Sequence, residues 1–207
     1  MQRIKNIEII MKILKKEMGR FQNPVATEIS KTTRSPYMVL ISCLLSLRTN
    51  DKITGPISKK LFEIVKTPHG ILVRKYGGKV PDDFNKLMEF KGVGRKTANI
   101  VMTYGFFKKD YIAVDTHVNR IPNRLGWIKT KKPEDTEEQL KKILPKKYWQ
   151  DFNDLIVTFG QNICRPIGPK CWECPVNKYC DYYKKVYIPS QKQETVAIKF
   201  LDPNTLK

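Results

Sequence analysis

The stretch Phe90-Lys91-Gly92-Val93-Gly94-Arg95-Lys96-Thr97-Ala98 predicts a tight two-glycine turn between two helices. Glycine lets the backbone take a positive φ and lets another group approach it closely. The second helix then presents unpaired N–H groups and the positive end of its dipole to an anion such as a phosphate. We therefore expect a helix–hairpin–helix that binds DNA through Gly92, Gly94 and Arg95, largely independent of base sequence. An ordinary glycine turn between two core helices is the alternative.

Lys96 is expected just inside the second helix, where nearby cations and helix-end N–H groups disfavour its charged form. A neutral lysine amine is a nucleophile that can form a Schiff base. Further along, Val114-Asp115-Thr116-His117 places a carboxylate at a predicted helix start, where Asp115 can be both a helix cap and a catalyst. His117 fits a structural role better than that of a general base. The spacing alone does not place Lys96 and Asp115 in one cleft.

Four of the five cysteines lie close together, as Cys164-x6-Cys171-x2-Cys174-x5-Cys180. An odd total, with no export signal expected in residues 1–20, favours reduced thiols over disulfides. A structural zinc site usually has two short Cys-x2–4-Cys pairs, whereas this pattern contains only the pair Cys171 and Cys174. Compact loops of several cysteines suit an iron–sulfur cluster, which is larger than one ion. The spacing favours an iron–sulfur cluster over zinc, with unbound cysteines third.

The chain is strongly basic: 39 lysines and arginines stand against 20 aspartates and glutamates in 207 residues, a formal charge of +19. Such a protein attracts polyanions, most commonly nucleic acid. A lysine-rich surface of solvated helix faces is the alternative. The longest apolar-rich run, Met38 to Leu47, is too short to cross a bilayer, so we expect no membrane partner.

Helical periodicity dominates the sequence, which predicts an all-α fold. Ser35-Pro36 is a helix start, and Pro122 is expected to kink or end early the helix that follows Asp115. Ile112-Ala113-Val114 is expected to be a brief extended run, and 195–200 is the only other candidate strand. Besides helices starting at Asp51 and after Asp115, the predicted helices cover 3–18, 36–47, 83–90, 95–107, 134–144 and 148–163.

Three motifs occur in the same order as in one known family. The runs Gly92–Asn99 and Ile112–Val118, followed by the four-cysteine pattern, resemble the endonuclease III family of the helix–hairpin–helix superfamily of DNA glycosylases. The resemblance covers residues 3–188. It implies the helix–hairpin–helix DNA glycosylase fold, in which two helical domains hold DNA between them.

The resemblance also implies a domain division. Residues 22–130 would form a helical barrel domain, residues 1–21 and 131–188 an iron–sulfur cluster domain, and residues 189–207 a C-terminal tail. Family members usually carry further helices between those expected at Asp51 and Asp83, so the barrel is expected to be shortened over 67–82.

The implied activity is that of a bifunctional DNA glycosylase and AP lyase of base excision repair. It would remove oxidised pyrimidines from damaged double-stranded DNA, as a monomer. Lys96 would attack C1′ of the flipped nucleotide and form the Schiff base that leads to β-elimination, and Asp115 would stabilise the developing sugar cation. A [4Fe–4S] cluster would be held by Cys164, Cys171, Cys174 and Cys180.

Two further residues are implied to contact DNA. Arg48 stands where many members have a glutamine that fills the gap left by the flipped base, and Lys170 belongs to the basic loop from Arg165. A different lesion, such as uracil or a mismatched base, is an alternative substrate. A non-catalytic DNA-binding iron–sulfur protein is an alternative function. We expect a cytoplasmic, nucleoid-associated protein.

Overall fold

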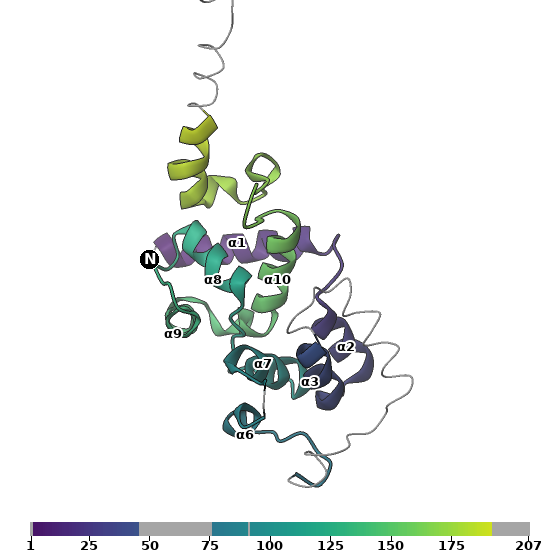
Figure 1. Cartoon of the computed structure of the whole chain (residues 1–207). Coiled ribbons are helices and arrows are strands. Elements are labelled where there is room, and N and C mark those ends of the chain that lie inside the picture. The colour runs from purple at the N-terminus through teal and green to yellow at the C-terminus, as the bar shows by residue number, and fades with distance from the viewer. Residues whose placement is uncertain (1, 46–75, 91, 192–207) are drawn as a thin grey trace, which may run out of the picture.

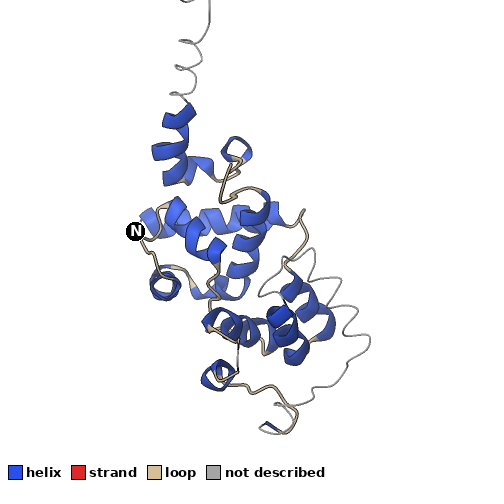
Figure 2. Ribbon diagram, viewed as in Figure 1, coloured by secondary structure: helices blue, strands red, loops and turns tan. Residues whose placement is uncertain are grey.

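The computed structural model describes residues 2–45, 76–90 and 92–191. Every regular element in these ranges is a helix, which confirms the all-α prediction (Figure 2). Among these helices, none combines the length and apolar character that crossing a membrane requires. The α-helices are α1 (Gln2–Met18), α2 (Val25–Thr33), α3 (Pro36–Leu45), α6 (Phe84–Met88), α7 (Arg95–Ile100), α8 (Thr116–Leu125), α9 (Pro133–Ile143) and α10 (Trp149–Asn162). Two π-helices, η2 (Val101–Gly105) and η6 (Tyr183–Tyr187), and three 3₁₀ turns, η3 (Lys146–Tyr148), η4 (Cys171–Glu173) and η5 (Asn177–Tyr179), complete the set.

Helices α1, α8, α9 and α10 enclose the first of two hydrophobic cores (Figure 1). The predicted apolar stripe of α1 supplies Ile7, Met11 and Leu14, all fully buried. Phe152 and Phe159 of α10 belong to the same core. Burying each such side chain contributes about 1.5–3 kcal/mol, so α1 is anchored by its stripe to helices more than a hundred residues away in the sequence.

The second core lies among α3, α6, α7 and η2, with α2 packed along α3 and η2 (Figure 1). Val39 and Leu40 of α3, Leu87 of α6, and Ala98 and Val101 of the α7–η2 run are its buried members. The helix predicted from Ser35-Pro36 is therefore confirmed over its described residues as a buried helix.

The extended run Ile112-Ala113-Val114 lies between the two cores. Ile112 and Val114 pack in the first core and Ala113 in the second, as expected where successive side chains point to opposite sides. Side-chain amides hold the buried carbonyls of this run: Asn99 Nδ2 donates to Ile112 O at 3.1 Å and Asn153 Nδ2 to Ala113 O at 2.8 Å. These bonds replace the partners that a strand would have found in a sheet.

The division between the cores differs from the predicted domain boundary at residue 130. Val118, Ile121 and Leu125 of α8 pack in the same core as α1 and α10. The two cores therefore meet at residues 112–114, because the apolar side of α8 faces α1, α10 and the part of the chain that carries the four clustered cysteines.

Several helix ends differ from the predicted ones. The helix predicted over 95–107 is an α-helix only to Ile100 and continues as the π-helix η2 to Gly105. Pro122 lies inside α8, which ends three residues later at Leu125, with Gly126 in the left-handed conformation (φ 76°). Helix α2 was not predicted, because its sequence is short and rich in threonine and serine.

Some predictions fall outside the described residues. They are the helix starting at Asp51, the end of the helix beyond residue 45, most of the shortened segment 67–82, the candidate strand 195–200, and the tail beyond residue 191.

Glu137 of α9 joins the two cores through a buried carboxylate. Its side chain is 6% exposed, and it accepts hydrogen bonds from Arg95 Nη2 at 3.1 Å, Lys141 Nζ at 2.7 Å and Asn99 Nδ2 at 3.2 Å. Burial opposes its charge, but the hydrogen bonds from Lys141 and Arg95 outweigh burial and lower the pKa of Glu137. The carboxylate is therefore charged at neutral pH and ties α9 to the helix that carries Lys96.

We predict that Glu137→Ala destabilises the protein by about 3 kcal/mol, because it leaves Arg95 and Asn99 without their buried partner. Urea unfolding followed by circular dichroism measures this. The exposed neighbour Glu138→Ala is the control and should change stability by less than about 0.5 kcal/mol. Since the pKa of Glu137 is lowered on folding, its contribution is present above about pH 4.3 and is lost as the pH falls through the folded-state pKa. Equal losses in the two variants would contradict this role.

Candidate functional site

A cleft of about 760 Å³ opens where the two cores meet. Lys96 lines it from α7, Asp115 and His117 from the start of α8, and Asp154 from α10. The structure thus brings Lys96 and Asp115, which the spacing could not place together, into one cleft with walls from both cores.

Asp115 is the N-cap of α8, as predicted. Its backbone is extended, and its Oδ1 accepts a hydrogen bond from Val118 N at 2.8 Å. Lys96 is exposed at the second position of α7, directly after the N-cap Gly94 and Arg95. A carboxylate fixed at a helix start and an accessible amine therefore face the same space, which is the arrangement a nucleophile and a charge-stabilising group require.

The two hairpin glycines differ in conformation. Gly92 has φ 90°, the left-handed region that favours glycine, as predicted for the turn. Gly94 has an ordinary φ of −100°, and a Cβ built there would meet no atom within 4 Å. The fold itself therefore does not require glycine at position 94, whose backbone is open to an approaching group.

Of the charged residues predicted to contact DNA, the structure describes Arg95 and Lys170. The guanidinium of Arg95 is paired with Glu137 and lies over the ring of Phe84, so part of its charge serves the fold. Lys170 Nζ pairs with Glu173 at 2.9 Å. Arg48 lies outside the described residues, as does Lys91.

His117 is held edge-on against α10. Arg120 Nη2 lies 2.9 Å from His117 Nδ1, and because arginine has no acceptor, Nδ1 must accept this bond. Nδ1 is therefore engaged by Arg120 and is not available as a base. The ring also sits over Gly160, where a Cβ would come within 2.2 Å of Nδ1. These contacts agree with the structural role favoured for His117.

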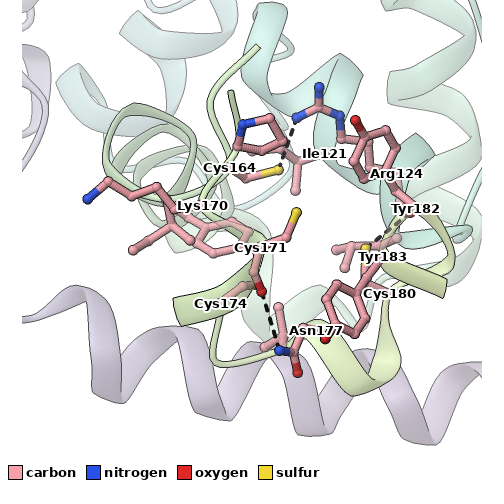
Figure 3. Close-up of a pocket in the computed structure, with 15 residues that line it drawn as sticks. Ile121, Arg124, Cys164, Lys170, Cys171, Cys174, Asn177, Cys180, Tyr182 and Tyr183 are labelled. Carbon is pink, nitrogen blue, oxygen red and sulfur yellow. Dashed lines mark hydrogen bonds between the residues drawn. The ribbon is translucent and has the colours of Figure 1, made fainter. Parts of the chain in front are cut away.

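The four clustered cysteines line a single apolar pocket with Ile121 and Phe159. Figure 3 shows the sulfur atoms of Cys164, Cys171 and Cys180 around a shared central space. Across the ranges that the structure describes, no group of three or more His, Cys, Asp or Glu side chains is arranged to hold a metal ion. The structure thus supports proximity of the four thiols and does not by itself identify what they hold.

Burial favours the protonated thiol at three of these cysteines, Cys171, Cys174 and Cys180, unless a cation joins them. It raises the pKa of Cys171 to about 11 and that of Cys174 to about 12, and neighbouring cysteines add to both shifts. Burial also raises the pKa of Cys180. A positively charged centre would reverse this balance, because coordinated thiols are deprotonated.

Arg124 of α8, which sequence reasoning missed, connects this pocket to the loop beyond it. Its guanidinium donates to Cys164 Sγ at 3.4 Å, to Arg165 O at 2.7 Å and to Pro166 O at 2.9 Å, and it lies over the Tyr182 ring (Figure 3). Arg120 donates to Cys164 O from the same face of α8. The sequence signal available for this role was the pair Arg120 and Arg124, which lie four residues apart after Asp115.

Sequence reasoning also missed a half-buried carboxylate at the cleft, that of Asp154. Asp154 accepts a hydrogen bond from Thr27 Oγ1 and faces the fully buried hydroxyl of Tyr104. The Tyr104 hydroxyl approaches the carboxylate without the geometry of a well-formed hydrogen bond. Burial raises the pKa of Asp154 to about 6 and that of Tyr104 well above its usual value.

Comparison of the sequence with known proteins finds a matching family and several similar proteins. The family of HhH-GPD superfamily base excision DNA repair proteins matches residues 41–146. Endonuclease III of Thermotoga maritima is 46% identical over 181 residues, covering 72% of this chain and 84% of that protein. Endonuclease III of Haemophilus influenzae is 30% identical over 90% of this chain and 99% of its own length.

Solved structures agree with these relatives. A non-covalent endonuclease III–DNA complex superposes with a TM-score of 0.76 at 29% identity, covering 88% of this chain and 97% of that one. A thermostable thymine-DNA glycosylase superposes with a TM-score of 0.73 at 25% identity, over 87% of this chain and 98% of that one.

We predict that Gly160→Ala destabilises the protein by about 2 kcal/mol, because the new methyl group would overlap the His117 ring and crowd Ile121. Thermal and urea unfolding measure the change. Gly19→Ala, whose added methyl group would make only ordinary contacts, is the control and should stay within about 0.5 kcal/mol of the parent. An unchanged stability of Gly160→Ala would show that His117 does not occupy this position.

Proposed function

The chain belongs to the HhH-GPD superfamily of base excision DNA repair proteins and, within it, to the endonuclease III family, and we propose that Lys96 and Asp115 are its catalytic pair. The protein is accordingly a DNA glycosylase and AP lyase. The observation that carries the proposal is that both residues line the one cleft at the meeting of the two cores.

A base within a duplex must be extruded before an enzyme can reach its sugar, and a cleft between two helical bodies can receive it. The amine of Lys96 forms a bond to C1′ while the bond from C1′ to the base breaks, and the proton that the amine loses leaves with the base. Opening of the sugar ring gives a Schiff base, and loss of a C2′ proton then expels the 3′-phosphate. Asp115 stabilises the positive charge that develops on the sugar.

The protein binds DNA, and we assign the backbone contact to the hairpin. Gly94 supports this because its backbone is open and the fold has no need of glycine there. Gly92 shapes the turn, Arg95 and Lys170 attract the DNA phosphates, and Arg48 fills the gap that the flipped base leaves. One chain carries the whole proposed site, so a monomer suffices, acting in the cytoplasm on nucleoid DNA.

Oxidised pyrimidines in double-stranded DNA are the proposed substrates, in keeping with the endonuclease III relatives. A thymine in a mismatch is the second candidate, favoured by the similarity to the thymine-DNA glycosylase structure. Duplexes carrying thymine glycol or a G·T mismatch separate the two, since the preferred substrate releases its base faster under single-turnover conditions.

We propose that Cys164, Cys171, Cys174 and Cys180 hold a [4Fe–4S] cluster. Their shared apolar pocket and the guanidinium of Arg124 beside Cys164 Sγ fit a buried group of thiolates with a cationic core. Such a cluster would brace the loops between its four cysteine ligands. It takes no part in the proposed chemistry on the sugar.

Borohydride trapping on duplex DNA with an abasic site tests the catalytic assignment. We predict a covalent protein–DNA adduct that Lys96→Gln abolishes, together with a fall of at least about 100-fold in base release. Lys109→Gln removes the same charge at an exposed position and should keep the adduct. An adduct that survives in Lys96→Gln would contradict the role of Lys96.

Metal analysis after anaerobic purification tests the cluster. We predict about four iron atoms and four sulfides per chain, with the broad visible absorption of an iron–sulfur cluster. Cys174→Ala should lose most of the iron, while Cys43→Ala, the cysteine outside the pattern, should retain it. One zinc ion per chain without iron would overturn the assignment.

A further inference from the structure

Asp154 occupies an unusual place, because it lies on the first core and binds the second. It belongs to α10, yet its carboxylate accepts from Thr27 of α2 and faces Tyr104 of η2, both of the second body of helices. All three residues line the cleft that holds Lys96 and Asp115. A carboxylate on one wall of a cleft, whose partners lie on the opposite wall, links the two walls.

This link between the walls extends to the helix that carries Lys96. Helix α7 continues without a break into η2, so Lys96 and Tyr104 stand near opposite ends of one helical run, Arg95–Gly105. Ser30 of α2 donates to the carbonyl of Tyr104, which attaches α2 to the same end. Asp154 therefore contacts both segments that fix the far end of the Lys96 helix.

The residue before Asp154 reaches the other wall. Asn153 Nδ2 donates to Ala113 O at 2.8 Å, two residues before Asp115. Adjacent residues of one helix thus hold the segment that presents Asp115 and the helical run that presents Lys96. Changing either contact would alter the separation between these two side chains.

We infer that Asp154 is a positioning residue, which sets the distance between Lys96 and Asp115 by clamping α2 to α10 through Thr27 while its carboxylate lies beside the Tyr104 hydroxyl. The inference rests on the catalytic assignment proposed above. Asp154 acts through the helices that it joins, because its carboxylate is engaged by Thr27 rather than directed at a reacting atom.

Single-turnover kinetics and DNA binding together test this role. At pH 8, Asp154→Ala should lower the rate of base release by about tenfold or more, since small misplacements of reacting groups are costly. Its affinity for DNA with a non-cleavable abasic analogue should change less than about threefold, because the clamp does not touch the hairpin. Asp154→Asn keeps an acceptor for Thr27 and should retain at least about 30% of the parent rate.

Two further variants distinguish the loss of this hydrogen bond from poor folding and from the loss of a carboxylate elsewhere on α10. Thr27→Val removes the same hydrogen bond from the other side and should show the same selective loss of rate, even if Asp154→Ala folds poorly. Asp151→Asn removes a carboxylate one turn earlier on α10, where it pairs with Lys15 at the surface, and should keep the parent rate within about twofold.

The pH dependence of stability checks that the Asp154 carboxylate occupies this half-buried place beside Thr27. Burial, aided by the neighbouring charge of Asp151, raises its pKa to about 6, and Thr27, Tyr104 and Lys31 act in the opposite direction. A raised pKa means that the folded state favours the protonated acid. Relative to Asp154→Asn, the parent should lose thermal stability as the pH rises from about 4 to about 6.

The outcomes separate this inference from the catalytic assignment. If the parent forms the borohydride adduct but Asp154→Ala and Thr27→Val release the base within twofold of the parent, the positioning role is refuted alone. Equal losses of rate and DNA affinity would also refute it, as would a stability difference that does not vary with pH. A parent that forms no adduct would instead refute the assignment of Lys96.

Discussion

The extended run Ile112-Ala113-Val114 is the element on which the rest of the structure depends. It passes between two hydrophobic cores and gives side chains to both, so its backbone is buried without a neighbouring strand. Buried carbonyls need partners, and the amides of Asn99 and Asn153 supply them from α7 and α10. Because this run ends at Asp115, the bonds that satisfy it also place a carboxylate at the meeting of the two bodies.

This arrangement explains how a helical protein positions a reaction between its parts. Lys96 comes from a helix of the second core, and Asp115 caps a helix of the first. Their relation depends on contacts between the cores, such as Glu137 with Arg95 and Asp154 with Thr27. The cysteine pocket lies against the first core, apart from the cleft that holds Lys96 and Asp115.

Local features of the site could be predicted from the sequence, and long-range ones could not. The cap at Asp115 and the positive φ of Gly92 depend on neighbouring residues, and the four cysteines lie close enough in sequence to share a pocket. The bond between Thr27 and Asp154 joins residues 127 positions apart, and no periodic pattern indicates it. Helix α2 was missed because its packing on α3 and η2, rather than its own sequence, stabilises it. The apolar residues of α8 pack in the first core, a long-range contact that the sequence pattern around the predicted boundary at 130 does not indicate.

The central claim is that the amine of Lys96 performs the covalent chemistry in this cleft. Peptide mapping by mass spectrometry, after borohydride trapping on abasic duplex DNA and nuclease digestion, tests it most directly. We expect a sugar-derived mass addition on the peptide that contains Lys96 and on no other lysine. A modified lysine elsewhere, with Lys96 unmodified, would contradict it.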